Sequence, residues 1–192
     1  MKIIIDAGHG PATNGKRTPE HLEQLFGAGI VEYRMNRLLS SELDECLQQQ
    51  GIATHHLPLY YDNHLRARAA EANRVATNGK HSRYLLLSCH CNAAPEGPRM
   101  TEPKGMELVV HSKESQAYKL AVELTKDMEE LGAKMRSVKC NRNLTLLSAT
   151  TMPAIIIEWG FMTNAEDVKM LNDQYMRYAL VRAFVSAIKK YI

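Results

Sequence analysis

The sequence lacks any apolar stretch that approaches the length of a transmembrane helix, about 18 residues, so no membrane anchor is expected. Its first residues also lack the basic segment and the cleavage motif of a secretory signal peptide. From these two absences we expect a protein that is synthesised in the cytoplasm. If it acts outside the cytoplasm, another factor must carry it there.

The sequence also has a small net charge and few cysteines. The net charge is only +3, and Lys and Arg are spread along the chain, so nucleic-acid binding is not indicated. Four cysteines among 192 residues fit reduced thiols rather than a disulfide framework. No repeat, linker or low-complexity segment interrupts the chain. We therefore expect residues 1–192 to form a single domain with one sizeable core.

Apolar patterns predict strands that alternate with helices. Strands are expected at 3–5, 52–59, 84–90, 106–111 and 154–158. Helices are expected at 30–50, 63–78, 115–131, 166–171 and 175–190, with a short helical turn at 20–25. Residues 132–147 should be irregular or partly extended, and residues 159–165 should form a loop. This alternation is typical of an α/β layered domain.

Two helices carry apolar stripes that predict their buried faces. In the helix at 30–50 the stripe consists of Val31, Met35, Leu38, Leu39, Leu43, Cys46 and Leu47. In the helix at 63–78 it consists of Leu65, Ala69, Ala72 and either Val75 or Ala76.

Three of the buried strands end in a residue that can bind a metal or transfer a proton. These residues are His9, His90 and Glu158. A titratable group at the end of an apolar run is costly to bury unless it is paired or bound to a metal. Because binding crevices form at the carboxyl ends of strands in open α/β sheets, three such residues indicate one shared crevice. The glycines on either side of His9 would allow the chain to turn tightly there.

The flanking sequence of His90 reads S-C-H-C-N and could suggest a zinc cluster with two cysteines. Strand geometry argues against this, because neighbouring side chains point to opposite faces. If His90 faces the crevice, Cys89 and Cys91 face away from it and act as small buried apolar residues.

Two histidines and one carboxylate are a common ligand set for a catalytic zinc ion. Glu20, Glu23 and Glu32 could each supply the carboxylate. Glu32 is preferred because a helix would hold it rigidly, whereas Glu20 and Glu23 lie in a polar loop and are expected at the surface. Glu158 then remains as a general base that takes a proton from the metal-bound water.

Four ordered motifs carry a resemblance to a known family. They read I-D-A-G-H-G at 5–10, G-I-V-E-Y-R-M-N at 29–36, S-C-H-C-N-A at 88–93 and M-P-A-I-I-I-E-W-G-F-M-T-N at 152–164. R-A-R-A-A-E-A-N at 66–73 is similar as well. Over essentially its whole length the chain resembles the zinc-dependent N-acetylmuramoyl-L-alanine amidases of bacterial cell-wall hydrolases and phage endolysins.

This resemblance implies a fold, a reaction and a set of residues. The fold would be a twisted, mostly parallel sheet of about six strands with helices on both faces. One zinc ion would be held by His9, Glu32 and His90, and Glu158 would be the catalytic base. The reaction would be hydrolysis of the amide between N-acetylmuramic acid and L-alanine in peptidoglycan. Asn92 and the loop 160–164 would shape the cleft.

Some features depart from the family pattern. Cys89, Cys91 and Trp159 stand where small or apolar residues are frequent, which could alter packing and substrate fit. We expect no separate wall-binding domain, and the loop 92–104 is too short and too rich in proline for the inhibitory helix of some division amidases. We therefore expect an enzyme without that form of autoinhibition, similar to a phage or prophage endolysin that a holin releases to the wall. A bacterial origin stays open, and a monomer is favoured.

Two other functions remain to be distinguished. The same zinc set on a related sheet could serve a peptidase or a deacylase. A catalytically inactive peptidoglycan-binding module is a further alternative, but such a module should lack a metal ligand or the base, and all four residues are present here.

Overall fold

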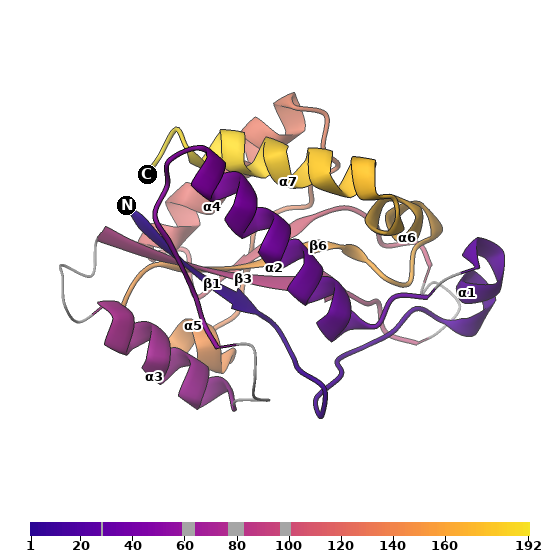
Figure 1. The fold of residues 1–192 in the computed structure, drawn as a ribbon, viewed down its shortest axis with the longest axis horizontal. Coiled ribbons are helices and arrows are strands. Elements are labelled where there is room, and N and C mark those ends of the chain that lie inside the picture. Colours follow the sequence, from indigo (N-terminus) through magenta and orange to yellow (C-terminus); the bar gives the residue numbers. More distant parts are fainter. Residues whose placement is uncertain (28, 59–63, 77–82, 97–100) are drawn as a thin grey trace.

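Strands from the whole length of the chain assemble into one central sheet (Figure 1). The computed structural model describes residues 1–27, 29–58, 64–76, 83–96 and 101–192. Within these residues the sheet contains six strands: β1 (Lys2–Ala7), β2 (Thr54–His56), β3 (Tyr84–Asn92), β4 (Glu107–Val110), β5 (Lys139–Cys140) and β6 (Ala154–Phe161). The order across the sheet is β2-β1-β3-β6-β4-β5. All neighbours are parallel except β4 and β6, so the expectation of a mostly parallel sheet is confirmed.

Helices cover both faces of this sheet, as expected for an α/β domain (Figure 1). The described residues form α1 (Glu20–Phe26), α2 (Glu32–Gln49), α3 (Leu65–Ala76), α4 (Gln116–Glu130), α5 (Thr145–Ala149), α6 (Ala165–Asn172) and α7 (Gln174–Ile188). Figure 1 shows α2, α6 and α7 above the sheet and α3 and α5 below it, while α1 lies to one side.

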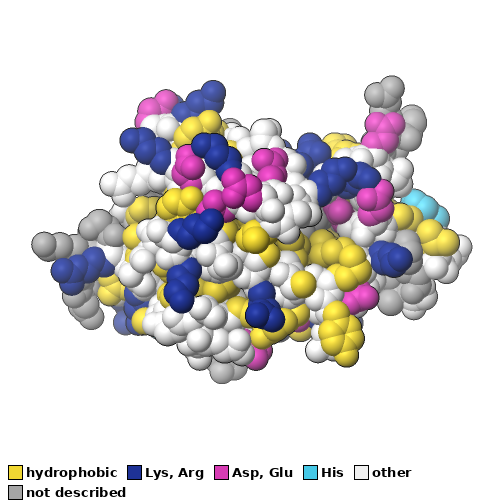
Figure 2. Space-filling view, turned by 90° about the horizontal axis from the view of Figure 1, so that it is seen from above, with side chains coloured by type: hydrophobic (Ala, Val, Ile, Leu, Met, Phe, Trp, Pro, Cys, Tyr) yellow, Lys and Arg dark blue, Asp and Glu magenta, His cyan; other side chains and the backbone are white. Residues whose placement is uncertain are grey.

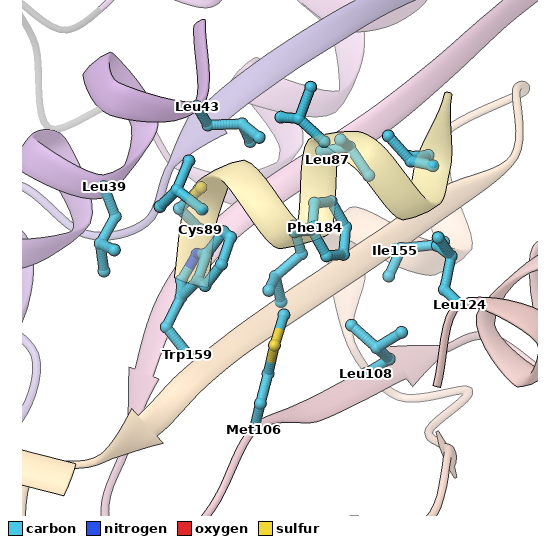
Figure 3. Close-up of a cluster of buried hydrophobic side chains, with 14 of the residues drawn as sticks. Leu39, Leu43, Leu87, Cys89, Met106, Leu108, Leu124, Ile155, Trp159 and Phe184 are labelled. Atoms are coloured by element: carbon cyan, nitrogen blue, oxygen red, sulfur yellow. The ribbon is translucent and has the colours of Figure 1, made fainter. Parts of the chain in front are cut away.

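The face under α2, α4 and α7 carries the larger core. Alternate strand residues point into it, among them Leu87, Cys89, Ile155 and Trp159 (Figure 3). Trp159 is completely buried, and its ring meets Phe184 of α7 edge to face, with 5.4 Å between the ring centres. Because side chains alternate along a strand, the neighbours of these residues must point to the opposite face.

The opposite face, under α3 and α5, is apolar at one end and polar at the other. Ile4, Leu86 and Ile156 pack there against Ala69 and Ala72 of α3. Further along the same strands, at their carboxyl ends, this face carries polar residues in the place of apolar ones. The sheet therefore positions a polar site at the end of its second core.

The last strand is longer than its sequence pattern predicts. Residues 159–161 were expected in a loop, but β6 continues to Phe161, so that expectation is wrong. The strand continues because the register to β3 shifts between His90 and Asn92, and because the Asp167 carboxylate accepts a hydrogen bond from the Phe161 backbone N–H at 2.7 Å. A side chain from α6 thus replaces a partner strand.

Other differences are local. Leu38 and Leu65 were expected to face inward, but 40% and 48% of their surfaces are exposed. The short helix α5 occurs where an irregular segment was expected. The predicted ends of one strand and one helix, at residues 59, 63, 77 and 78, and residues 97–100 of the loop 92–104 lie outside the described residues.

Charged side chains of both signs are interspersed on the face that Figure 2 shows, without a large patch of one sign. Among the described residues, none of the helices combines the length and the apolar character needed to cross a bilayer.

A buried ion pair joins the two long helices of the larger core. The Arg177 guanidinium of α7 donates hydrogen bonds to both carboxylate oxygens of Glu42 in α2, at 2.8 to 3.1 Å. It also donates to the Leu171 carbonyl at 2.6 Å. Both side chains are buried, so the loss of one partner would leave an unpaired charge in the interior.

We predict that Glu42→Gln destabilises the protein by roughly 3 kcal/mol, because Arg177 then lacks its counter-charge. Glu45→Gln on the exposed side of the same helix is the matched control and should change the stability by less than about 0.5 kcal/mol. Urea unfolding followed by circular dichroism measures both variants. Equal midpoints for the two would contradict the importance of this pair.

Candidate metal centre

The carboxyl ends of β1 and β3 and the start of α2 bring together His9, His90 and Glu32. Glu32 Oε1 lies 3.2 Å from His9 Nε2 and 3.1 Å from His90 Nδ1. The two imidazole rings are edge to face, with 5.2 Å between their centres. One potential ligand atom from each residue lies within 4.8 Å of the others. Among the three glutamates considered from the sequence, the structure places Glu32 with the two histidines.

Glu32 is oriented by the loop that precedes its helix. The Lys16 backbone N–H donates to Glu32 Oε2 at 2.8 Å, which leaves Oε1 directed at the histidines. Gly15 is required beside it, because a Cβ atom there would lie 2.3 Å from Oε2 and because its φ is +75°. The loop that the sequence marked only as polar and long therefore positions the carboxylate.

The electrostatics of the three groups favour a charged carboxylate. Burial alone would raise the pKa of Glu32, but hydrogen bonds with His9 and His90 outweigh it and lower the pKa to about 2. For His90, burial disfavours the protonated ring, yet the hydrogen bond to Glu32 and the nearby carboxylates give a net rise in its pKa. The cluster thus holds a permanent negative charge between two imidazoles.

His9 has a left-handed backbone, with a φ of 61°, although it is not a glycine. This conformation is costly for a residue with a Cβ atom and needs support from its surroundings. Arg68 of α3 supplies this support, since its guanidinium donates to the carbonyl of His9 at 2.7 Å and also to that of Ala7. Asp6 in turn holds the guanidinium at 2.8 Å.

Asp6 of β1 influences His9 indirectly. Its carboxylate interacts with Arg68 and accepts a hydrogen bond from Ser88 Oγ at 2.6 Å, so it reaches His9 through Arg68 and the backbone. No role for Arg68 was predicted from the sequence. The feature that could have indicated a role for Arg68 is its position next to Ala69, on the face of the helix that is expected to be buried.

Gly8 makes room for the second histidine. A Cβ atom on Gly8 would lie 2.2 Å from the His90 ring, so the close approach demands a glycine. Its carbonyl accepts a hydrogen bond from Asn36 Nδ2 at 3.0 Å. Asn36 lies one helical turn after Glu32, so α2 contributes both a candidate ligand and a brace for the turn of β1.

Glu158 lies directly opposite His90 in the register of β3 and β6. Its Oε2 atom is buried and has no hydrogen-bond partner among the described residues. Burial raises the pKa of this carboxyl, an effect that the neighbouring His90 opposes. A buried acceptor without a partner is unusual in a folded protein and marks a position that a ligand or a proton can use.

These residues line a cavity of about 330 Å³ with one polar and one apolar side. His9, Glu32, His90 and Glu158 form the polar side, and Leu65, Leu144, Leu146 and Ile156 contribute the apolar side. Asn92 also lines the cavity, as expected. Within 160–164, Asn164 instead caps α6 by accepting hydrogen bonds from the backbone of Glu166 and Asp167.

Cys89 and Trp159 point away from the cluster into the larger core. Cys91 belongs to the same core but also lines the cavity, and both cysteines are buried, as expected. Burial raises the pKa of the Cys89 thiol to about 12, and the pKa of Cys91 rises well above its usual value for the same reason. Both remain protonated at neutral pH and are poor metal ligands.

A mostly parallel α/β sheet that brings His9, His90 and Glu158 from its strand ends together with Glu32 from the start of α2 defines a candidate metallohydrolase. The sequence profile of one family, N-acetylmuramoyl-L-alanine amidase, matches residues 3–190. The chain belongs to this family.

Individual relatives agree with this assignment. The chain is 23% identical to the uncharacterized protein YqiI of Bacillus subtilis, over 98% of this chain and 84% of that protein. It is 26% identical to the endolysin of Bacillus phage SPP1, over 88% of this chain but only 58% of the endolysin. Several other curated relatives are also matched over just 57% of their length. The fold is similar to the crystal structure of an N-acetylmuramoyl-L-alanine amidase from Clostridium difficile 630, with a TM-score of 0.83, 23% identity and coverage of 99% and 95% of the two chains.

We predict that Gly8→Ala lowers the affinity for zinc by at least about tenfold, because the new methyl group displaces the His90 ring. The matched control is Gly27→Ala, where a Cβ atom meets open space although the φ is +69°. This control should retain zinc affinity. Competition titration with a chromogenic chelator measures both, and equal affinities would refute the argument from close approach.

Arg68→Lys should weaken zinc binding by about 10- to 100-fold, since an ammonium group cannot bond to Asp6 and to two backbone carbonyls in the same geometry. Arg66→Lys, an exposed position on the same helix, should leave the affinity unchanged. The same titration applies. Unchanged binding by Arg68→Lys would show that His9 keeps its backbone conformation without this support.

Proposed function

We propose that this chain hydrolyses the amide bond between the lactyl group of N-acetylmuramic acid and L-alanine in peptidoglycan, with one zinc ion as cofactor. The observation that carries this proposal is the convergence of His9, Glu32 and His90 beside the unpartnered oxygen of Glu158. Membership in the amidase family supports the choice of substrate.

The donor set fits zinc. Two neutral imidazole nitrogens and one carboxylate oxygen are a frequent ligand set of catalytic zinc, and this set leaves a position open for substrate. We assign His9, Glu32 and His90 as the ligands. When bound, zinc would act as a Lewis acid towards the scissile carbonyl and acidify the attacking water.

Glu158 is the general base in this proposal. Its unpartnered Oε2 accepts the proton of the attacking water, and the carboxyl then donates this proton to the leaving amine of L-alanine. Burial favours the first step, because a raised pKa stabilises the protonated carboxyl that forms when Oε2 accepts the proton. No other residue is needed to carry the proton.

The shape of the cavity suits the substrate. Its apolar side, with Leu65, Leu144 and Leu146, can contact the methyl groups of the lactyl and alanine units. A larger groove of about 910 Å³ adjoins it and shares Lys16 and Ala93 with its lining. A polymeric substrate can therefore extend from the cleavage site across the surface.

We further propose that the site of action is the bacterial cell wall. The endolysin-like role with holin-type release, expected from the sequence, remains part of this proposal, and the similarity to the phage SPP1 endolysin supports it. Lysis of a host by the purified chain only when it is supplied together with a holin would test that role.

Glu158→Gln should lower kcat by about 10²- to 10⁴-fold and leave zinc bound, because the amide cannot accept the proton but preserves the shape of the side chain. His9→Ala and His90→Ala should lose both zinc and activity. Glu166→Gln, an exposed carboxylate near the end of β6, is the control and should retain full activity. Hydrolysis of defined muropeptides, followed by mass spectrometry with and without a chelator, measures these effects.

The products also separate the alternatives. An amidase releases a stem peptide with a free L-alanine amino group and leaves the sugar intact. A peptidase would cut within the peptide, a deacylase would release a free acyl group, and a binding module would release nothing. Full activity of Glu158→Gln would overturn the assignment of the base.

A further inference from the structure

Arg136 is fixed rigidly beside the start of β4. Its backbone N–H donates to the Met106 carbonyl at 2.8 Å, and the Met106 N–H donates to the Lys134 carbonyl at 2.8 Å. Met106 and Met135 also form a parallel bridge. The backbone of Arg136 is therefore part of the sheet edge, although its segment looked irregular in the sequence.

The guanidinium of Arg136 contacts Glu107 and the Phe161 ring, and the rest of the group is exposed to solvent. Its Nε donates to Glu107 Oε2 at 3.2 Å, and its central carbon lies 5.1 Å from the centre of the Phe161 ring. The described residues engage only Nε, and 39% of the side chain is exposed. Both terminal amino groups thus remain available to a ligand, in an orientation that the ion pair and the aromatic ring fix in advance.

Two strand pairings connect Arg136 to the proposed catalytic centre. His90 pairs directly with Glu158, and Glu158 pairs directly with Glu107 on the next strand. Directly opposed residues of antiparallel strands have Cβ atoms about 5 Å apart. Across the sheet the side chains therefore follow one another in this order: His90, a candidate zinc ligand; Glu158, the proposed base; Glu107; and Arg136.

The local charge favours an anion. Glu107 is buried and contacts Arg136 and, at 3.5 Å, Lys139. Arg136 and Lys139 carry two positive charges against the one carboxylate that both contact, and the Lys139 contact keeps Glu107 paired when Arg136 also binds a ligand. An arginine fork with two free amino groups matches a carboxylate in a bidentate arrangement.

Resting on the proposed function, we propose that Arg136 binds the free α-carboxylate of the second residue in the stem peptide. That residue is a glutamate joined through its side-chain carboxyl, so its α-carboxylate is not consumed in the chain. It follows the scissile nitrogen by about two extended residues, or roughly 7 Å. A stem peptide that runs from Glu158 across the neighbouring strand β4 therefore carries this carboxylate towards the side of the sheet where Arg136 lies.

The experiment compares three muramoyl tripeptides with the zinc-loaded chain. One carries free carboxylates, one is amidated at the α-carboxylate of the second residue, and one is amidated at its C-terminus. The wild type should cleave the second substrate with a kcat/KM about 10- to 100-fold lower than the first, in line with loss of a charge-assisted hydrogen bond. The third substrate should match the first, which distinguishes the two sources of carboxylate.

Arg136→Met should lower kcat/KM for the first substrate by a similar factor and abolish the discrimination between the first and second substrates. A purely structural role would lower the rates on both and keep their ratio. Arg136→Lys retains the positive charge beside Glu107 and should keep only part of the discrimination between the first and second substrates. This variant replaces Arg136→Met in the test if the Met variant does not fold. Arg142→Met, an exposed arginine paired with Glu114, is the control and should behave as the wild type.

Equal kcat/KM values of the wild type for the first two substrates would overturn the assignment of Arg136 and leave the proposed amidase function intact. Retained discrimination in Arg136→Met would do the same. Cleavage of none of the substrates by the wild type would instead overturn the proposed function, and this inference with it.

Discussion

The rest of the site depends on the hydrogen bonds that the Arg68 guanidinium donates to the backbone at the end of β1. A strand that ends in a polar residue would normally turn outward into solvent, but here the guanidinium binds the carbonyls of Ala7 and His9 and is itself held by Asp6. These bonds stabilise the left-handed backbone of His9. The imidazole is thereby directed to Glu32 and His90. The ion pair is buried, and because its charges are used on backbone carbonyls it determines geometry more than it adds stability.

The alternation of the sheet separates reactive groups from structural ones. Cys89 and Trp159 point into the core under α7 (Figure 3). His90 and Glu158, one residue away from each, line the cavity under α3 and α5. A shift of one residue in the register of β3 or β6 would exchange the two sets. The large apolar side chains of the core therefore fix the register, and the register in turn fixes which polar groups meet.

The parts that could be predicted from the sequence are those with a periodic or terminal signal. The apolar run Ile3–Ile5 ending at His9, the helical stripe after Glu32 and the strand end at Glu158 each carry their own pattern. The supports of the site do not, since Arg68, Asn36 and the backbone of Lys16 act through contacts between residues that are distant in sequence. The role of the glycines was predicted only in part, because Gly8 supplies space for a ring while His9 itself adopts the positive φ. Only packing in three dimensions distinguishes these two uses of a glycine-rich turn.

Two buried carboxylates on neighbouring strands illustrate how the fold assigns different tasks to the same chemical group. Glu107 and Glu158 are directly paired, so both face the same side of the sheet. Glu107 contacts two cations, Arg136 and Lys139, and its charge is compensated. Glu158 has an oxygen with no partner, and burial raises its pKa. Because only the second carboxylate can gain a proton without breaking an ion pair, the environment of Glu158 suits the proton transfer that we propose for it, whereas Glu107 holds a cation.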